Sequence, residues 1–499
     1  MRPPPPPISR FGTTPTDALT LSPGWGDGRG TVWYGITQGF LSPEGRVAQG
    51  DAGVLVIGPP RSGKTSGVII PTVLAFDGPA VTASTKPDVL TAVGAHRQQS
   101  GRLWLFDPTG TTPTIPGVTA ARWSPLVSVT GWDSARDVAS QMVKAEDRSH
   151  NTHSDAGDFF RGRATDLLAV ALYQAHRDGT GFDAVLETLS WPQELWAETA
   201  RTFEEAMADT GHIADLLASQ AAKRLAGMAP REYSGTIGTA SNTLAAYQRT
   251  SGLNTTTNPN FNPEQFATSG DTLFIVADGA HMAEVAPIVV ALVDTITRTR
   301  YRLHTIDPGA PRLLLALDEI ANLCPLPSIT SMWSEAGGQG VTLLAAVQDM
   351  TQVTQRWGAD HGWLSLATQK FLLPGIADHD TLHALSDLQG EYEHHRTTHT
   401  RGRGWGATDS ESDTYTWRPN IPIDTYTRIP AGTGRLIVGA TDHGLITLTP
   451  AHTHPLWANH IGPPQPRTLT QLANQQPAVV AGPAPAGSFA DTASRQGRR

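Results

Sequence analysis

The sequence predicts an α/β fold in which a mostly parallel sheet is interrupted by an inserted all-α domain. Three observations predict it. The motif Gly58-Pro-Pro-Arg-Ser-Gly-Lys-Thr65 follows a short apolar run and precedes a helical pattern, which is the strand–loop–helix context of a phosphate-binding loop. A second apolar run, Arg312-Leu-Leu-Leu-Ala-Leu-Asp-Glu-Ile320, ends in two carboxylates. Helical periodicity fills much of the long stretch between them.

Length and composition fit an ordinary globular protein. The chain has 499 residues, of which 39% are hydrophobic and 17% charged, and this is enough for two or three domains. Its net charge of −9 argues against a generally basic protein that coats nucleic acid, although DNA in a local basic channel stays compatible with it. Cys324 is the only cysteine, so an internal disulfide is excluded. With no apolar run of membrane-spanning length and no signal-peptide core, we expect a cytoplasmic protein.

The two ends of the chain differ in composition from the rest. Residues 1–45 form a Pro/Gly-rich N-terminal segment, whose proline run predicts an extended tail and whose Val32-Trp-Tyr34 predicts a short strand. Residues 461–499 are rich in Pro, Ala and Gln, and this composition predicts a disordered tail.

Residues 46–145 are predicted to form the first part of a nucleotide-binding domain. After the strand at 53–57, apolar runs at 79–84 and 102–107 predict two further strands, with helical patterns between them. Alternating strands and helices indicate a parallel sheet that binds ligands at the carboxyl ends of its strands. Lys86 and Asp107 fall at such ends, where they either line a ligand path or face water.

The phosphate-binding loop carries the predicted nucleotide contacts. Backbone amides of such a loop and the following helix N-terminus direct partial positive charge at a polyphosphate. Lys64 is expected to reach the β- and γ-phosphates, and Thr65 to offer its hydroxyl to Mg²⁺. The alternative is a surface Gly/Pro turn that happens to carry a lysine, and the flanking strand and helix patterns favour the loop. The expected nucleotide-binding residues are Gly58, Pro59, Pro60, Arg61, Ser62, Gly63, Lys64, Thr65 and Ser66.

Residues 146–265 are predicted to form the inserted all-α domain. Apolar residues recur at helical spacing along 158–173, and further helical stretches follow at 191–208, 211–227 and 234–249. Trp191 and Trp196 are interpreted as core residues, with base stacking as the alternative.

Residues 266–460 are predicted to complete the nucleotide-binding domain. The apolar run before Asp318 and Glu319 predicts a strand buried on both faces of the sheet. Asp318 is expected to hold Mg²⁺ through Thr65 or water, and Glu319 to polarise the attacking water. The strand 340–348 ends in Gln348, which can sense the γ-phosphate and transmit hydrolysis. Adjacent carboxylates after a strand are common by chance, but a phosphate-binding loop in the same chain makes them significant.

Four other features complete this part. The segment 282–301 predicts a long helix that is broken early at Pro287. A helix and a strand follow at 363–373, and runs at 435–439 and 445–448 predict a closing hairpin. The polar, histidine-rich segment 391–416 is interpreted as a mobile loop, and no Cys or carboxylate pattern completes a metal site there.

The order of motifs resembles that of the coupling proteins of conjugative type IV secretion, the TraG/TraD-like class, over residues 50–455. Besides the two nucleotide motifs, the resemblance rests on Gly67-Val-Ile-Ile-Pro71, Ser84-Thr-Lys-Pro-Asp88, Phe106-Asp-Pro-Thr-Gly110, Trp123-Ser-Pro-Leu126 and Val347-Gln-Asp349. It implies a RecA-like, DNA-dependent ATPase that assembles as a homo-hexameric ring. Such rings move single-stranded DNA or protein substrates to a secretion channel, and their α domain recognises the relaxosome.

Three departures from that class bear on function. The class usually has N-terminal membrane helices, which are not found here, so attachment to the inner face of the cell membrane would need a partner. The segment Glu335-Ala-Gly-Gly-Gln-Gly340 lacks the arginine that often reaches the neighbouring subunit's nucleotide, and Arg356 is the alternative source. Ser84 stands where the class often has an acidic residue.

Three functions are therefore weighed. The first is an ATP-driven motor for single-stranded DNA during conjugation, with a relaxase and channel proteins as partners. The second is a double-stranded DNA pump of the FtsK type, which the polar tail disfavours because such pumps usually end in a winged-helix domain. The third is a nucleotide-switched, non-catalytic substrate adaptor, which the missing arginine and the acidic net charge favour.

Overall fold

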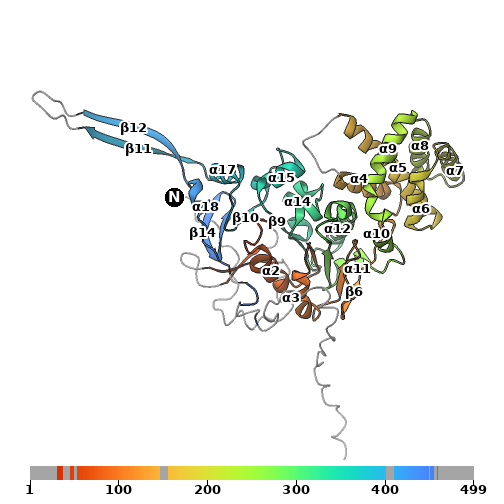
Figure 1. Cartoon of the computed structure of the whole chain (residues 1–499). Coiled ribbons are helices and arrows are strands. Elements are labelled where there is room, and N and C mark those ends of the chain that lie inside the picture. The colour runs from red at the N-terminus through yellow and green to blue at the C-terminus, as the bar shows by residue number, and fades with distance from the viewer. Residues whose placement is uncertain are drawn as a thin grey trace, which may run out of the picture.

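The computed structural model describes residues 31–37, 45–49, 53–146, 155–400, 410–448, 450–453 and 458. The expected N-terminal tail and the expected disordered tail lie outside these residues. The described chain forms a large mixed sheet, a group of helices at one end of the molecule and a separate two-stranded hairpin at the other (Figure 1).

The large sheet has twelve strands in the order β2-β1-β14-β13-β10-β3-β9-β8-β4-β7-β5-β6. From β10 to β6 all neighbouring strands are parallel, and from β10 to β2 they are antiparallel. The predicted mostly parallel α/β sheet is confirmed. The strands are β1 Thr31–Thr37, β2 Gly45–Gln49, β3 Val54–Ile57, β4 Ala80–Ser84, β5 Leu103–Phe106, β6 Val118–Ala120, β7 Thr272–Val276, β8 Leu313–Leu317, β9 Val341–Val347, β10 Gln369–Leu372, β13 Thr433–Val438 and β14 Thr441–Thr447.

The central strands are buried on both faces, which explains their continuous apolar sequences. In β8, Leu313, Leu315 and Leu317 pack into one hydrophobic core, and Leu314 and Ala316 pack into the other. This alternation follows from the two-residue period of a strand. The second core is covered by α2 (Ile70–Ala75) and α3 (Asp88–Arg97), and the first by the long helix α12 (Met282–Ile306).

Every described element between β6 and β7 is helical, and these helices gather at one end of the molecule (Figure 1). Trp196 is fully buried there and donates to the Tyr233 hydroxyl, and Trp191 packs against its ring. These contacts agree with the predicted core role of both tryptophans. The α-helices are α4 Trp132–Glu146, α5 Asp155–Asp178, α6 Phe182–Glu187, α7 Leu195–Thr210, α8 Ile213–Ala226, α9 Pro230–Thr243, α10 Thr250–Asn254 and α11 Pro263–Ala267.

Helix α4 packs on both α5 and α12, so the helical packing begins before residue 146. The division into the segments 46–145, 146–265 and 266–460 stays a prediction. Among the described helices, none combines the length and the apolar character needed to cross a membrane.

The predicted break at Pro287 is wrong, because α12 continues through that residue. A proline inside a helix removes the hydrogen bond to the carbonyl four residues earlier, here Ala283. Since Pro287 lies close to the start of α12, the long apolar stretch after it still forms a regular, buried helix. The remaining helices are α13 Ile320–Leu323, α14 Ile329–Glu335, α15 Met350–Trp357, α16 Trp363–Leu366, α17 His379–Leu388 and α18 Ile423–Thr427.

The interpretation of 391–416 as a mobile loop is also wrong. The strands β11 (Glu391–Thr400) and β12 (Ser410–Pro419) pair as an antiparallel hairpin in full register. Neither face of this hairpin joins the core, so its sequence shows no apolar alternation. Its threonines and aromatic residues nevertheless favour extended structure.

A buried arginine ties the first helices to the sheet. The Arg97 side chain is almost completely buried at the end of α3 and donates to the carbonyls of Phe76, Gly78 and Gly270 and to the Thr272 hydroxyl. Burial lowers its pKa to about 10, which leaves it charged at neutral pH. The contacts join the chain before β4 to the chain before β7.

Replacing Arg97 by alanine should therefore destabilise the protein strongly, because buried carbonyls would lose their donor at about 1–3 kcal/mol each. We expect Arg97→Ala to lower the midpoint of thermal unfolding by about 5–10 °C in a chain of this size. Circular dichroism against temperature measures it. Arg201→Ala, at an exposed position in α7, is the matched control and should leave the midpoint unchanged; equal midpoints for both variants would contradict the clamping role.

Candidate nucleotide site

The phosphate-binding loop joins β3 to the helix that follows. Its first amide, Gly58 N, donates to Val347 O at 3.1 Å, which ties the loop to the end of β9. A Cβ at Gly58 would lie 2.7 Å from Leu373 Cβ, so only glycine fits there. Gly63 has φ 98° and Arg61 has φ 64°, so the loop winds through left-handed conformations that bring its amides to one side.

The predicted helix after the loop is present, and it begins with a wider turn. Residues Thr65–Ile69 form a π-helical turn that continues into α2. Such π-helical turns are rare in proteins, and those that do occur are often found at functional sites. The helix N-terminus therefore points at the loop, as anion binding requires.

The Lys64 side chain is buried inside its own loop. Its Nζ donates to the carbonyls of Gly58 and Pro59, the latter at 3.2 Å. Burial lowers the Lys64 pKa, and the nearby charges of Asp318, Glu319 and Asp349 oppose that shift. The loop thus holds an ammonium group among carboxylates at the carboxyl edge of the sheet.

Asp318 follows β8 and reaches across to the loop. Its Oδ2 accepts from Thr65 Oγ1 at 2.8 Å and from Ser84 Oγ at 3.4 Å. The residue as a whole is half-buried, but its Oδ1 is shielded from solvent and has no hydrogen-bond partner. Burial raises the Asp318 pKa. The hydrogen bond from Thr65 and the charge of Lys64 lower it again, but only in part. A buried carboxylate oxygen beside a threonine hydroxyl fits a hard divalent cation such as Mg²⁺.

Glu319 lies beside Asp318 and is half-buried. Its Oε1 accepts from Asn322 Nδ2 at 2.6 Å, which orients the carboxylate from the first turn of α13. Burial lowers the pKa of Lys64, and the negative charge of Glu319 opposes that shift, which indicates that the two side chains belong to one site. A fixed carboxylate at this point can accept a proton from, or orient, a water molecule.

The strand β9 lies between β3 and β8, and the half-buried Gln348 directly follows it. The residue before it, Val347, accepts the loop amide of Gly58. The residue after it, Asp349, caps α15 by accepting from Gln352 N at 2.8 Å, and Gln352 Oε1 in turn accepts from Gln348 N at 3.1 Å. Residue-by-residue reading of the sequence assigned no role to Asp349 or to the Ser84 hydroxyl. For Asp349 the signal is similar to that for Asp318, a carboxylate within two residues of the end of a buried strand.

Comparison with known proteins places the chain in a family. A family model described as type IV secretory system conjugative DNA transfer matches residues 13–425. The chain belongs to this family. The sequence-based identification as a coupling protein of the TraG/TraD-like class is thereby confirmed.

Relatives of this conjugative DNA transfer family include two curated conjugal transfer proteins named TraG. The one from Escherichia coli is 25% identical over 364 residues, which cover 68% of this chain and 53% of that protein. The one from Agrobacterium fabrum is 24% identical over 418 residues, which cover 80% of this chain and 58% of that protein. The chain spans little more than half the length of these relatives.

Solved structures of a plasmid coupling protein, TrwB, share the fold. Its complex with ADP and Mg²⁺ superposes with a TM-score of 0.58 at 16% identity, covering 82% of this chain and 88% of that chain. Its complex with a non-hydrolysable ATP analogue gives a TM-score of 0.55 over the same shares. At this identity the likeness shows the fold, which confirms the predicted RecA-like P-loop core.

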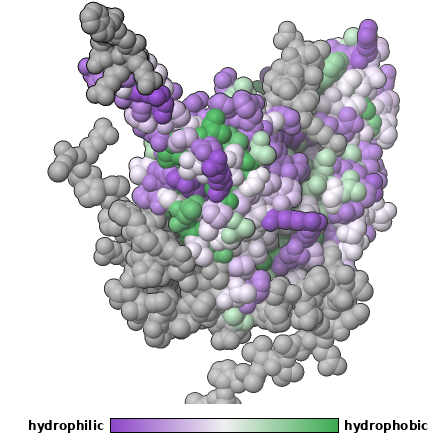
Figure 2. All heavy atoms as spheres, turned by 60° about the vertical axis from the view of Figure 1, so that its left-hand side comes forward, coloured by the Kyte–Doolittle hydropathy of each residue, from purple (hydrophilic) through white to green (hydrophobic). Residues whose placement is uncertain are grey.

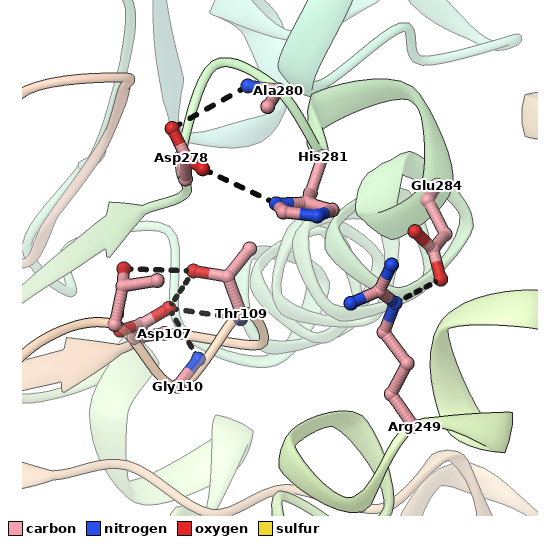
Figure 3. A network of polar contacts seen from close by, with 9 residues as sticks. Asp107, Thr109, Gly110, Arg249, Asp278, Ala280, His281 and Glu284 are labelled. Atoms are coloured by element: carbon pink, nitrogen blue, oxygen red, sulfur yellow. Dashed lines mark hydrogen bonds and ion pairs between the residues drawn. The ribbon is translucent and has the colours of Figure 1, made fainter.

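Two residues at neighbouring strand ends, Lys86 and Asp107, make no described side-chain contact with the nucleotide site. The Lys86 backbone N donates to Ser84 Oγ at 3.4 Å, so only its main chain supports the site. Lys86 is exposed to solvent. The Asp107 carboxylate accepts from Thr109 N and Gly110 N (Figure 3). It also accepts from Thr112 N, and these three bonds shape the turn after β5. The structure favours a local structural role for Asp107 over a ligand contact.

The end of the adjacent strand β7 carries a second local network (Figure 3). Asp278 accepts from Ala280 N at 3.4 Å and contacts His281 Nδ1 at 3.2 Å, at the start of α12. One turn further on, Glu284 pairs with Arg249 at 2.6 Å and so ties α12 to the chain before α10. These contacts fasten the sheet edge to the helical region.

Arg356, the alternative source of a trans-acting arginine, lies in the last turn of α15. Its guanidinium donates to the carbonyl of Ala145 near the end of α4 in the same chain. In this conformation Arg356 joins α15, which Asp349 caps, to the helical region. Its contact with a neighbouring subunit stays a prediction.

The stability cost of the buried Asp318 carboxylate can be tested by substitution. Because burial raises the Asp318 pKa, the folded protein resists ionising this group, and stability is lost as the pH rises above the ordinary carboxyl pKa of 3.8. Asp318→Asn removes that charge and still accepts from Thr65. We expect the ligand-free variant to be about 1 kcal/mol more stable than the parent at pH 7.

The same variant should lose any stabilisation by Mg²⁺ and nucleotide together, because a neutral amide binds a divalent cation poorly. Thermal unfolding at pH 7, with and without both ligands, measures the two effects. Asp209→Asn, exposed in α7, is the matched control and should change neither. A lower midpoint for ligand-free Asp318→Asn would contradict the cost assigned to the buried carboxylate.

Proposed function

We propose that this chain is an ATP-hydrolysing coupling protein of conjugative type IV secretion that moves single-stranded DNA to the transfer channel. The observation that carries the proposal is the convergence of Lys64, Thr65 and Asp318 at the carboxyl edge of one parallel sheet, in a member of the conjugative DNA transfer family. A site of this composition binds a polyphosphate with a divalent cation.

ATP and Mg²⁺ are the proposed ligands. The solved TrwB complexes contain ADP with Mg²⁺ and an ATP analogue, and TrwB shares this fold. Thr65 and Asp318 would hold the cation, which supplies charge neutralisation between the phosphates when bound. The proposed nucleotide contacts are the loop residues Gly58, Pro59, Pro60, Arg61, Ser62, Gly63, Lys64, Thr65 and Ser66.

Each catalytic side chain has a distinct proposed role. Lys64 exchanges its contacts with the Gly58 and Pro59 carbonyls for phosphate oxygens, where its charge stabilises the transferred group. Glu319, oriented by Asn322, positions the attacking water and accepts its proton. Gln348 at the end of β9 responds to the γ-phosphate and passes the change to α15.

The proposed partners follow from the family resemblance. They are single-stranded DNA, a relaxase or relaxosome, the channel proteins of the secretion system and five further copies of the chain in a hexameric ring. The helical region between β6 and β7 is proposed to recognise the substrate complex. We place the protein in the cytoplasm, at the inner face of the cell membrane, with a partner making the membrane contact.

A nucleotide-switched adaptor is the second candidate. The segment 335–340 before β9 has no arginine, and Arg356 is already bonded to Ala145 in the same chain. A trans-acting arginine is worth several orders of magnitude in turnover where it exists. An adaptor would bind nucleotide tightly and turn over negligibly, even with DNA at concentrations that favour a ring.

Steady-state ATP hydrolysis by the purified protein tests the proposal directly. We expect single-stranded DNA to stimulate turnover more than duplex DNA of equal length does. Glu319→Gln should lower kcat at least about 100-fold while nucleotide binding is retained, because it removes a general base but not a phosphate contact. Lys64→Ala supplies the blank, and Glu205→Gln in α7 is the matched control that should keep full turnover.

The outcomes separate the candidates. Equal rates for the parent and Lys64→Ala, with tight nucleotide binding by the parent, would favour the adaptor. A clear preference for duplex DNA would favour the double-stranded DNA pump. Turnover that Glu319→Gln leaves intact would refute the role proposed for that carboxylate.

A further inference from the structure

The hairpin β11–β12 is a separate element with a firmly anchored base. It projects from the body on the side away from the helical region (Figure 1) and forms a hydrophilic protrusion (Figure 2). At its base Asn420 N donates to Gly390 O and Asn420 Nδ2 to Gln389 O, both at 2.9 Å. Ser386 Oγ donates to Ile421 O at 2.8 Å, which closes the junction between α17 and α18. The hairpin therefore extends from a fixed point.

Large aromatic side chains stand exposed on this hairpin. Tyr392 is 42% exposed, Tyr415 60% and Trp417 67%, and among the described residues only Phe159 is another exposed aromatic side chain of comparable size. An isolated two-stranded hairpin is marginally stable in water. Exposed Trp and Tyr on such an element are typical of a surface that a partner covers.

The register assigns the charges to opposite faces. Directly paired residues share a face, and alternate residues along each strand change face. One face, here called the acidic face, carries four carboxylates and no Arg or Lys. The other, the basic face, carries two arginines and no carboxylate. The acidic face contains Glu391, Glu393, Glu411 and Asp413 with Tyr415 and Trp417, and the basic face contains Arg396 and Arg418 with Tyr392 and threonines.

Contacts within the acidic face leave most of its negative charge available. His395 lies 3.1 Å from Asp413 and His399 lies 3.6 Å from Glu411, and these histidines compensate a carboxylate only when protonated. His395 also stacks on Tyr415, with ring centroids 4.7 Å apart. The pairs are solvent-exposed, so the attraction within each pair is weak.

We propose that the acidic face of one copy's hairpin stacks on the basic face of the hairpin of a second copy of this chain. Opposite charges then meet directly, and Trp417 and Tyr415 gain arginine neighbours for cation–π contacts. The two surfaces differ, so the contact is head-to-tail and repeats around a closed ring. The inference rests on the homo-oligomeric ring proposed above and adds the element that sets the register between neighbours.

Nucleic acid is the less favourable occupant. DNA on the basic face would meet only two arginines, while the four carboxylates of the same narrow ribbon would repel the phosphates. Stacking on a second copy uses both faces of the hairpin, and every carboxylate-bearing face then lies against an arginine-bearing face. One hairpin face is also smaller than the roughly 800 Å² per partner of a stable complex, so the stack reinforces other contacts of the ring.

Charge reversal tests the proposal. The double variant Arg396→Glu/Arg418→Glu makes both faces acidic, and the triple variant Glu391→Lys/Glu393→Lys/Glu411→Lys makes both faces basic. Each alone should need about tenfold more protein for half-assembly than the parent, because like charges then face each other. Equimolar mixing should restore assembly to within about threefold, since alternating subunits pair acidic with basic faces at every contact.

Mass photometry and sedimentation velocity measure assembly over a concentration series at low and high salt. Thermal unfolding and nucleotide binding, which should match the parent, establish that each variant folds. Assembly of both variants like the parent would overturn the hairpin inference while leaving the ring intact. Weakened variants that mixing does not restore would also overturn it. A parent that stays monomeric throughout would refute the ring itself, and loss of DNA binding by the double variant with normal assembly would assign the basic face to DNA.

Discussion

The contact between the Thr65 hydroxyl and the Asp318 carboxylate depends on three parallel strands being in correct register. The phosphate-binding loop leaves β3, Asp318 leaves β8, and β9 lies between them. A slip of one residue in β8 would turn Asp318 to the other face of the sheet. Because β8 and β9 come late in the chain, the helical region must leave the sheet after β6 and return at β7 without disturbing this register.

The local sequence was enough to predict the buried strands of this arrangement, because a buried strand needs apolar residues. The strand runs at 54–57, 313–317 and 341–347 are apolar, with Thr342 as the one hydroxyl residue, because both faces of each strand are buried. The hairpin at 391–419 was missed for the opposite reason, since neither of its faces enters the core. The bond from Ser84 to Asp318 could not be predicted either, because it joins residues 234 apart in sequence and depends on strand order.

The distribution of charge carries more information than its sum. A net charge of −9 argued against a nucleic-acid-coating protein, yet the hairpin keeps two arginines apart from four carboxylates on opposite faces. Strand periodicity alone produces this separation, because residues of one sign occupy positions of the same parity. The field of such a surface acts over about a Debye length, roughly 8 Å at physiological salt, and so acts on a direct neighbour.

The ligand-free site carries two costs that a bound nucleotide and cation would relieve together. The Lys64 ammonium is buried against loop carbonyls, and Asp318 keeps a buried oxygen without a partner. Polyphosphate oxygens satisfy the ammonium, and a cation satisfies the carboxylate, so each ligand improves the site for the other. The loop amide of Gly58 donates to Val347 O at the end of β9, and Asp349, two residues further on, caps α15. Its last turn holds the end of α4 through Arg356. The nucleotide site is thereby joined to the helical region through the short helix α15.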